Sequence, residues 1–432
     1  MQSQDNQSQT RTSLENQGVT PPAKRRVQSA WEPLKYQVYR SFWIAGLFSN
    51  MGTWMHETGA QWLMTSLEPR PEMVSAVRTA MTLPVFFLAL PAGVWADRFD
   101  RRTYLLATQV ILLLTASILA VLSALDCVSP TVLLMFSAAM GVAMILNQPA
   151  WQALTPDLVP PALVPAAVAV GSISFNLARS LGPAIGGLVI AYCGVWATFA
   201  VNAISFSAVI AVLLVWQPDD NYPRPVRTVF RDELRKGIFI VSQTPYLRNA
   251  LTRLCLFAVP ASILWSLLSL VATEKLLFRE RGFGVCLGLI GAGAVLGAWF
   301  LPHARARFSS ESITFFAKAI FAAVLMTIGF SDSEWLIMPA LTIVGACWMT
   351  NMTTLNATAQ INLPRKFRAR GMAAFLMSFA AGMTSGSLIW GWLAFYTSLG
   401  TSFVVAGFTM LGCTLAVHWL KIGPLVSDGQ SP

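Results

Sequence analysis

Long apolar runs, separated by short intervals that hold most of the charges, constrain the fold of this chain more than any other feature. Hydrophobic residues make up 55% of its 432 residues and charged residues only 12%, whereas soluble proteins carry about 25% charged residues. A run of about 20 apolar residues crosses the hydrocarbon core of a bilayer. These proportions exclude a cytosolic enzyme and predict an integral membrane protein.

The apolar runs are long enough for twelve membrane spans. They lie at about 41–65, 75–96, 103–125, 130–153, 164–191, 194–216, 249–273, 283–301, 312–330, 335–361, 372–396 and 400–420. The long polar connection between the sixth and seventh spans suggests a repeated unit. We therefore expect an all-α integral membrane protein with twelve transmembrane helices in two six-helix halves.

The polar segments set the expected domain limits. Residues 1–38 form a basic cytoplasmic tail that is rich in Gln, Ser and Asn, a composition typical of disorder. The first half covers 39–217, the linker 218–248, the second half 249–421 and a second cytoplasmic tail 422–432. The tail at 1–38 lacks the apolar stretch of a cleavable signal peptide.

The positive charges predict the orientation, because cytoplasmic loops are enriched in Lys and Arg. With the first tail inside, the inner segments hold 22 Lys and Arg and the outer loops hold 4. We expect both termini in the cytoplasm and the spans in the inner (plasma) membrane. Arg253 and Lys318 lie about two turns from cytoplasmic span ends, where their side chains can reach the interface, and we assign them no function.

The loop between the second and third spans reads GVWADRFDRR from Gly93 to Arg102. It resembles the G-x-x-x-D-R-x-G-R-R signature of the major facilitator superfamily, with Asp100 at the usual place of the second glycine. Further segments resemble the enterobactin-exporter, or transmembrane secretion effector, branch of that superfamily. They include 50–54, 61–64, 147–156, 174–183, 345–348, 355–360 and 387–392. The resemblance covers about 40–420 and implies the superfamily fold and an exporter.

The signature loop is the predicted cytoplasmic gate. The resemblance implies that its charges clamp the second helix to its neighbours when the cytoplasmic side is closed, and the alternative is a positive-inside anchor. An acid at a membrane boundary needs a partner, which favours the gate. The predicted gate residues are Gly93, Asp97, Arg98, Arg101 and Arg102.

The fifth span carries Gly182, Pro183, Gly186 and Gly187, which resemble the antiporter motif of proton-coupled exporters in the superfamily. Small residues let helix backbones approach closely. The eighth span offers Gly288, Gly291, Gly293 and Gly297 as the opposing surface. The functional hypothesis is a sliding contact between the halves, and the alternative is ordinary membrane helix packing.

Glu57 is the only acidic residue inside a span. A buried charge in a bilayer usually faces a cavity and has a function, and a proton-driven exporter needs a group that binds and releases a proton. Glu57 is therefore the first candidate for proton coupling, with His56 next to it. Arg179 and Arg78 reach a similar depth, so a static ion pair with Glu57 is the alternative.

A polar stripe marks the expected substrate cavity. Asn50, Trp54, Glu57 and Gln61 share one face of the first helix at spacings of 4, 3 and 4 residues. The resemblance adds residues from the helices that line the cavity in this superfamily: Asn147, Trp151, Gln152, Trp265, Ser269, Trp348, Asn351 and Asn356. Amides and tryptophans suit a bulky, aromatic or amphipathic solute, and Arg179 favours an anionic one. Trp151 and Trp265 could instead serve packing or the interface.

Other chemistries find no support in the sequence. The six cysteines show no paired spacing, and we expect no metal, no cofactor and no enzyme activity. The net charge is +10, but the basic residues lie between membrane spans instead of forming a patch on a soluble domain. We therefore expect no nucleic-acid partner. The expected partners are a small-molecule substrate, protons and the lipid bilayer, and we expect a monomer.

The sequence thus predicts a secondary transporter that exports a siderophore-like or amphipathic drug-like molecule, with proton antiport and alternating access. Two alternatives stay open. One is an importer of an organic solute on the same fold, and the other is a membrane receptor or scaffold without transport. The motif at Gly182 and Pro183 favours export.

Overall fold

The computed structural model describes residues 31–217, 243–278, 280–361 and 368–417, and these residues form helices and no strand. The expected all-α fold is confirmed. The expected tail at 422–432 lies outside the described residues, as do most of the tail at 1–38 and most of the linker at 218–248.

The first half contains seven α-helices for six expected spans. They are α2 (Gln37–Leu67), α3 (Pro71–Thr82), α4 (Pro84–Arg98), α5 (Arg101–Ala124), α6 (Pro130–Leu154), α7 (Val164–Cys193) and α8 (Val195–Val215). The second expected span is divided into α3 and α4 at Leu83. Pro84 causes this break, because it has no N–H to donate to the preceding turn and its ring favours the start of a helix.

The described residues of the second half form six α-helices. They are α10 (Pro245–Leu270), α11 (Glu280–Arg305), α12 (Ser310–Phe330), α13 (Glu334–Ile361), α14 (Arg368–Tyr396) and α15 (Leu399–Ala416). A short π-helical turn, Val271–Lys275, extends α10.

Eleven helical segments among the described residues are long and apolar enough to cross a membrane. The helix outside this set is α2, which has 31 residues and therefore ample length. Its polar stripe, which includes Asn50, Glu57 and Gln61, lowers its hydropathy. The least apolar expected span is thus the one with the most polar residues of the predicted site.

The helices of the two halves pack in the same way. In the first half α2 packs against α7, α5 against α8, and α4 and α5 against α6. In the second half α10 packs against α14, α12 against α15, and α11 and α12 against α13. Each pair joins helices at equivalent positions in the two halves, an arrangement expected of an internal repeat.

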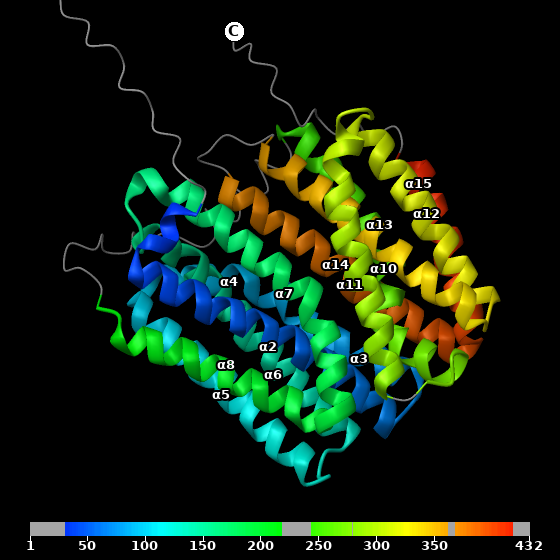
Figure 1. The fold of residues 1–432 in the computed structure, drawn as a ribbon, viewed down its shortest axis with the longest axis horizontal. Helices are drawn as coiled ribbons and strands as arrows, with labels where there is room; N and C mark the ends of the chain where they lie inside the picture. Colours follow the sequence, from blue (N-terminus) through cyan, green and yellow to red (C-terminus); the bar gives the residue numbers. More distant parts are fainter. Residues whose placement is uncertain (1–30, 218–242, 279, 362–367, 418–432) are drawn as a thin grey trace, which may run out of the picture.

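The two most extensive contacts between the halves, among the described residues, are also related by the repeat. The fifth span of the first half, α7, lies beside α11, and the fifth span of the second half, α14, lies beside α3 (Figure 1). Gly187 meets Gly284 at the first contact, and Ser75 meets Gly391 at the second. These four residues lie at one end of the bundle, and α2 starts at the other end. We name the end with the four residues the joined end.

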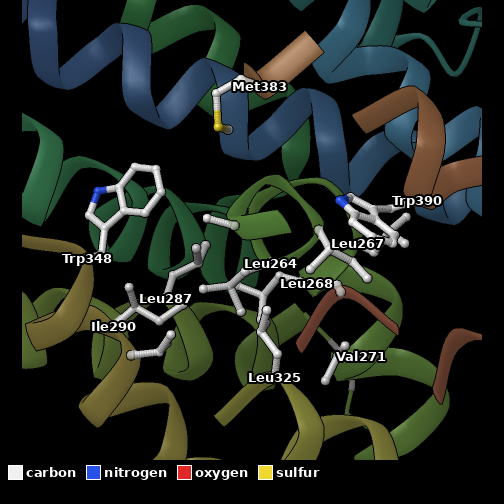
Figure 2. Packing of buried hydrophobic residues seen from close by; sticks show 14 of the residues in the cluster. Leu264, Leu267, Leu268, Val271, Leu287, Ile290, Leu325, Trp348, Met383 and Trp390 are labelled. Atoms are coloured by element: carbon white, nitrogen blue, oxygen red, sulfur yellow. The ribbon is translucent and has the colours of Figure 1, made fainter. Parts of the chain in front are cut away.

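The interior of the second half is built around α10, the most deeply buried candidate span in the described part of the chain. Figure 2 shows Leu264, Leu267 and Leu268 of α10 between Trp348 of α13 and Trp390 of α14. Trp390 donates a hydrogen bond from Nε1 to the carbonyl of Val259 at 2.7 Å, next to Pro260. This core holds α10 in place beside the boundary between the halves.

The expectation that Arg253 and Lys318 reach the interface is wrong. Their side chains lie inside the second half, and the two residues are only 4% and 3% exposed. Arg253 of α10 and Lys318 of α12 turn toward neighbouring helices, so position along the sequence did not reveal the direction of either side chain.

Candidate functional site

Glu57 of α2 and Arg78 of α3 form an ion pair inside the first half, through Oε1 and Nη1. Their side chains are 20% and 12% exposed. The spacing along the sequence predicted a similar depth for these two residues, and the structure brings them into contact. A carboxylate and a guanidinium in direct contact neutralise each other, which lowers the cost of placing both in a membrane protein.

The pair is linked to the contact between the halves. Thr82 Oγ1, one turn after Arg78, donates to the Arg78 carbonyl at 2.9 Å. The same hydroxyl oxygen lies 2.6 Å from Oγ1 of Thr384 on α14. Thr82 is also the last residue of α3. The ion pair therefore lies one turn before both the helix break and the contact with the second half.

His56 lies elsewhere in the first half. It is fully buried and its ring meets Phe199 of α8 edge-on at 4.8 Å. Both ring nitrogens have no hydrogen-bond partner among the described residues. Consecutive residues on a helix point about 100° apart, so His56 faces α8 whereas Glu57 faces α3.

Arg179 lies on the wall of a pocket between the halves. Its Nη2 atom is 3.7 Å from the sulfur of Met349 on α13. The other lining residues are mostly apolar and come from α7, α10, α11 and α13: Pro183, Trp265, Leu287, Ile290, Gly291, Ala294, Trp348 and Met349. Trp265 and Trp348 meet edge-on with ring centroids 5.1 Å apart. The lining of this pocket thus combines one guanidinium with two indole rings.

Two polar contacts between α2 and α10 lie from the pocket residue Trp265 toward the joined end. Gln61 Nε2 of α2 donates to the carbonyl of Trp265 at 2.6 Å. One turn further on, Thr65 Oγ1 donates to Ser269 Oγ at 2.7 Å, and both side chains are buried. Gln61 and Ser269 were predicted to line the cavity, and the structure places them in this contact between α2 and α10.

Several other residues predicted to line the cavity have contacts within one half. Asn147 Oδ1 accepts hydrogen bonds from Thr108 at 3.0 Å and Gln109 at 3.3 Å, which ties α6 to α5. Trp151 packs edge-on against Phe42 of α2 at 6.1 Å. Asn351 is buried and donates to the carbonyl of Cys347 at 2.9 Å.

The remaining predicted cavity residues have varied surroundings. Trp54 packs against Gly182 of α7. Asn50 and Asn356 are half-buried, and Gln152 is exposed. Among all residues predicted for the cavity or for coupling, the pocket therefore brings together Arg179, Trp265 and Trp348.

The described contacts of the predicted gate residues lie within the first half. Arg101 forms an ion pair with Asp157 in the short 3-10 turn Thr155–Asp157 and donates to the Ala153 carbonyl at 2.7 Å. Arg102 donates to the carbonyls at the end of α8, Leu213 at 2.8 Å and Leu214 at 2.7 Å.

Arg98 and Gly93, two further predicted gate residues, have open surroundings. Arg98 is exposed, and a side chain at Gly93 would meet open space. The Asp97 side chain lies outside the described residues. Arg101 and Arg102 thus tie the start of α5 to the end of α6 and to α8. The sequence analysis did not identify Asp157 as the partner of Arg101, because its position after Thr155 and Pro156 gave no sign of an ion pair.

The glycines of α7 do allow close helix contacts. A methyl group at Gly187 would overlap the backbone of Gly284 on α11. Gly182 faces Trp54, and Gly186 faces Met55 of α2. Part of the expected opposing surface was wrong, because Gly293 and Gly297 pack against α13 instead of α7. Gly284, which was not predicted, meets the backbone of Gly187 on α7.

Two repeated halves, which meet at Gly187 and Gly284 and at Ser75 and Gly391, have a pocket on their boundary. This is the architecture of many secondary transporters. The chain belongs to the transmembrane secretion effector family of the major facilitator superfamily, whose model matches residues 28–432. This membership confirms the resemblance identified from the sequence. It also makes the protein a multi-pass membrane transporter and not an enzyme.

Three curated relatives cover most of the chain at low identity. The staphyloferrin A transporter of Staphylococcus aureus is 22% identical over 396 residues, which are 88% of this chain and 95% of the relative. The transporter YfiS of Bacillus subtilis is 25% identical and covers 88% of this chain and 92% of the relative. The multidrug efflux pump Tap of Mycolicibacterium fortuitum is 27% identical, with coverage of 85% and 92%.

Solved structures show the same fold. The nucleoside transporter NupG aligns with a TM-score of 0.71 at 10% identity and covers 89% of this chain and 99% of its own. An inward-facing, unoccupied bacterial homologue of the lysosomal transporter Spinster aligns with a TM-score of 0.66 at 12% identity, with coverage of 90% and 97%. The expected twelve-helix major facilitator fold is thereby confirmed.

Proposed function

We propose that this protein exports a small molecule across the inner (plasma) membrane in exchange for protons, by alternating access of the pocket between its halves. The observation that carries the proposal is the position of the Glu57–Arg78 ion pair. The pair is one turn from Thr82, which contacts the second half at Thr384, so a change in its charge acts directly on a contact between the halves.

Proton exchange at Glu57 supplies the coupling step. The ionised carboxylate holds Arg78 and fixes α3 to α2. When Glu57 binds a proton the attraction is lost, and the guanidinium needs other partners, which favours a different position of α3. A transporter that changes conformation only with either a proton or a substrate bound exchanges one for the other.

The contacts of the described residues support an inward-open state. The contacts between the halves lie at the joined end and near the middle of the bundle. Toward the opposite end, side chains at Gly93 of α4 and Gly171 of α7 would meet open space. With both termini in the cytoplasm, as the positive charges predict, the joined end is the outer one.

The pocket supports a bulky substrate with an aromatic or amphipathic body and an anionic group. Trp265 and Trp348 offer flat apolar surfaces, and the Arg179 guanidinium offers a positive charge that also stacks on rings. The relatives named as a staphyloferrin A transporter and a multidrug efflux pump support a siderophore-like or drug-like solute.

Transport in everted membrane vesicles tests the proposal. Vesicles that contain the protein should accumulate staphyloferrin A, or a fluorescent amphipathic anion, when their lumen is made acidic, and collapse of the pH gradient should release it. Accumulation only with the opposite gradient would favour the importer. Binding without accumulation in either direction would favour the receptor.

A further inference from the structure

A second pocket lies within the second half, away from the boundary between the halves. Its lining comes from α10, α12 and the end of α15, and α15 packs against both of the other helices. Its lining residues are Arg253, Glu311, Thr314, Phe315, Lys318, Thr414 and Val417. None of them lines the pocket beside Arg179. Glu311, at the start of α12, and Val417, just after α15, mark its mouth at the end of the bundle opposite to the joined end.

The pocket contains two cations that are almost completely buried. Arg253 is 4% exposed and Lys318 is 3% exposed. Lys318 Nζ lies over the ring of Phe257 at 6.0 Å from its centroid, a weak electrostatic contact that brings no counter-charge. Each cation therefore needs a negative group nearby to offset the cost of burial.

The residues that line the pocket supply only one such group. Arg253 and Lys318 repel each other, and Glu311 attracts Arg253. The Thr314 hydroxyl donates to the carbonyls of Ser310 and Glu311, both at 3.0 Å, and the Thr414 hydroxyl donates to the Met410 carbonyl at 2.7 Å. Two cations and one carboxylate leave the lining with a net positive charge.

We propose that this pocket binds one phosphate group, carried by an anionic phospholipid or by free inorganic phosphate. A phosphate accepts several charge-assisted hydrogen bonds and matches the geometry of a guanidinium. Its negative charge neutralises the surplus positive charge between α10 and α12. Basic pockets between transmembrane helices on the cytoplasmic side recognise lipid headgroups, and the proposed orientation places the mouth of this pocket on that side.

Binding at this site stabilises the contacts of α12 and α15 with α10 and leaves the transport pocket free. The site does not depend on the direction of transport or on proton coupling. Its failure would leave the proposed function intact, and failure of transport would leave the site intact.

Thermal unfolding of the purified full-length protein tests the site. The protein is measured with phosphatidylglycerol, with phosphatidylcholine, and with inorganic phosphate against chloride at equal ionic strength. Phosphatidylglycerol, inorganic phosphate or both should raise the unfolding midpoint of the wild type, because a ligand that binds only the folded state stabilises it. A response to phosphatidylglycerol alone identifies a lipid, and a response to inorganic phosphate identifies the free anion as sufficient.

Lys318→Gln should require an about tenfold higher ligand concentration for the same shift, whereas Lys318→Arg, which keeps the charge, should respond like the wild type. Arg307→Gln is the matched control, since Arg307 is an exposed cation outside the pocket. Equal responses of wild type and Lys318→Gln would overturn the site. If Lys318→Gln fails to fold, the wild type decides alone: no shift with either ligand, and no phospholipid or phosphate retained in native mass spectrometry, would also overturn it.

Discussion

Arg78 contacts Glu57 across α2 and α3, one turn before the residue at which α3 ends and touches the second half. This relationship gives a partly buried ion pair a position from which it can affect the contact between the halves. A pair that served only to neutralise charge would not need to be next to a helix break.

The first prediction concerns the energy of that pair. Glu57→Gln and Arg78→Gln should each lower the unfolding midpoint in detergent, because each leaves the other residue without its counter-charge. The double variant should be more stable than the sum of the single effects implies, with a coupling energy of about 0.5–3 kcal/mol. Additive effects would show that the two side chains do not interact in the folded protein.

The second prediction concerns the contact between α7 and α11. Gly187→Ala should reduce transport strongly, since its methyl group overlaps the Gly284 backbone and opposes closure of the joined end. Gly171→Ala is the matched control on the same helix, because its methyl group meets open space. Initial rates in vesicles with equal amounts of protein compare the two, and equal rates would show that this contact is not used in the transport cycle.

The third prediction concerns the substrate pocket. Arg179→Gln should weaken binding of an anionic amphipathic probe about tenfold or more, with little change for a neutral probe of the same shape. Trp348→Leu should weaken both, since it removes an aromatic surface. Fluorescence titration measures the affinities, and Arg98→Gln, an exposed cation outside the pocket, serves as the control. Loss of both probes in Arg179→Gln would contradict the electrostatic role.

The fourth prediction concerns orientation. A reporter enzyme that is active only outside the cytoplasm should be silent when fused after Asp220 and active when fused within 275–281. The reason is the excess of Lys and Arg on the side that holds the central linker. The reverse pattern would invert the assignment of the joined end to the outside.

The helices were predictable from the sequence because a membrane span is set by length and hydropathy alone. An ion pair of Glu57 with one of two arginines was also predictable, since few charges in spans share a depth. The sequence could not distinguish Arg78 from Arg179 as the partner, because that choice depends on rotation of each helix about its axis. The structure shows the pair with Arg78 and places Arg179 against Met349.

Side-chain direction explains the other differences. Asn147 and Trp151 of α6 were predicted to line the cavity, yet they turn toward α5 and α2. Lys318 lies near a span end, yet it points between helices. An amide or cation at a given depth has the same sequence signature whether it faces a cavity, a neighbouring helix or the interface. Packing between helices distant in sequence makes that distinction.

The proton-coupling role of Glu57 is most directly tested by pH-driven accumulation in everted vesicles that contain Glu57→Gln, whose side chain mimics the protonated acid. Glu68→Gln, which alters an acid in the partly exposed pair with Arg70, is the control. We predict that Glu57→Gln protein, present in normal amounts, still binds and exchanges substrate but no longer concentrates it, while Glu68→Gln transports normally. Full pH-driven accumulation by abundant Glu57→Gln protein would contradict the account.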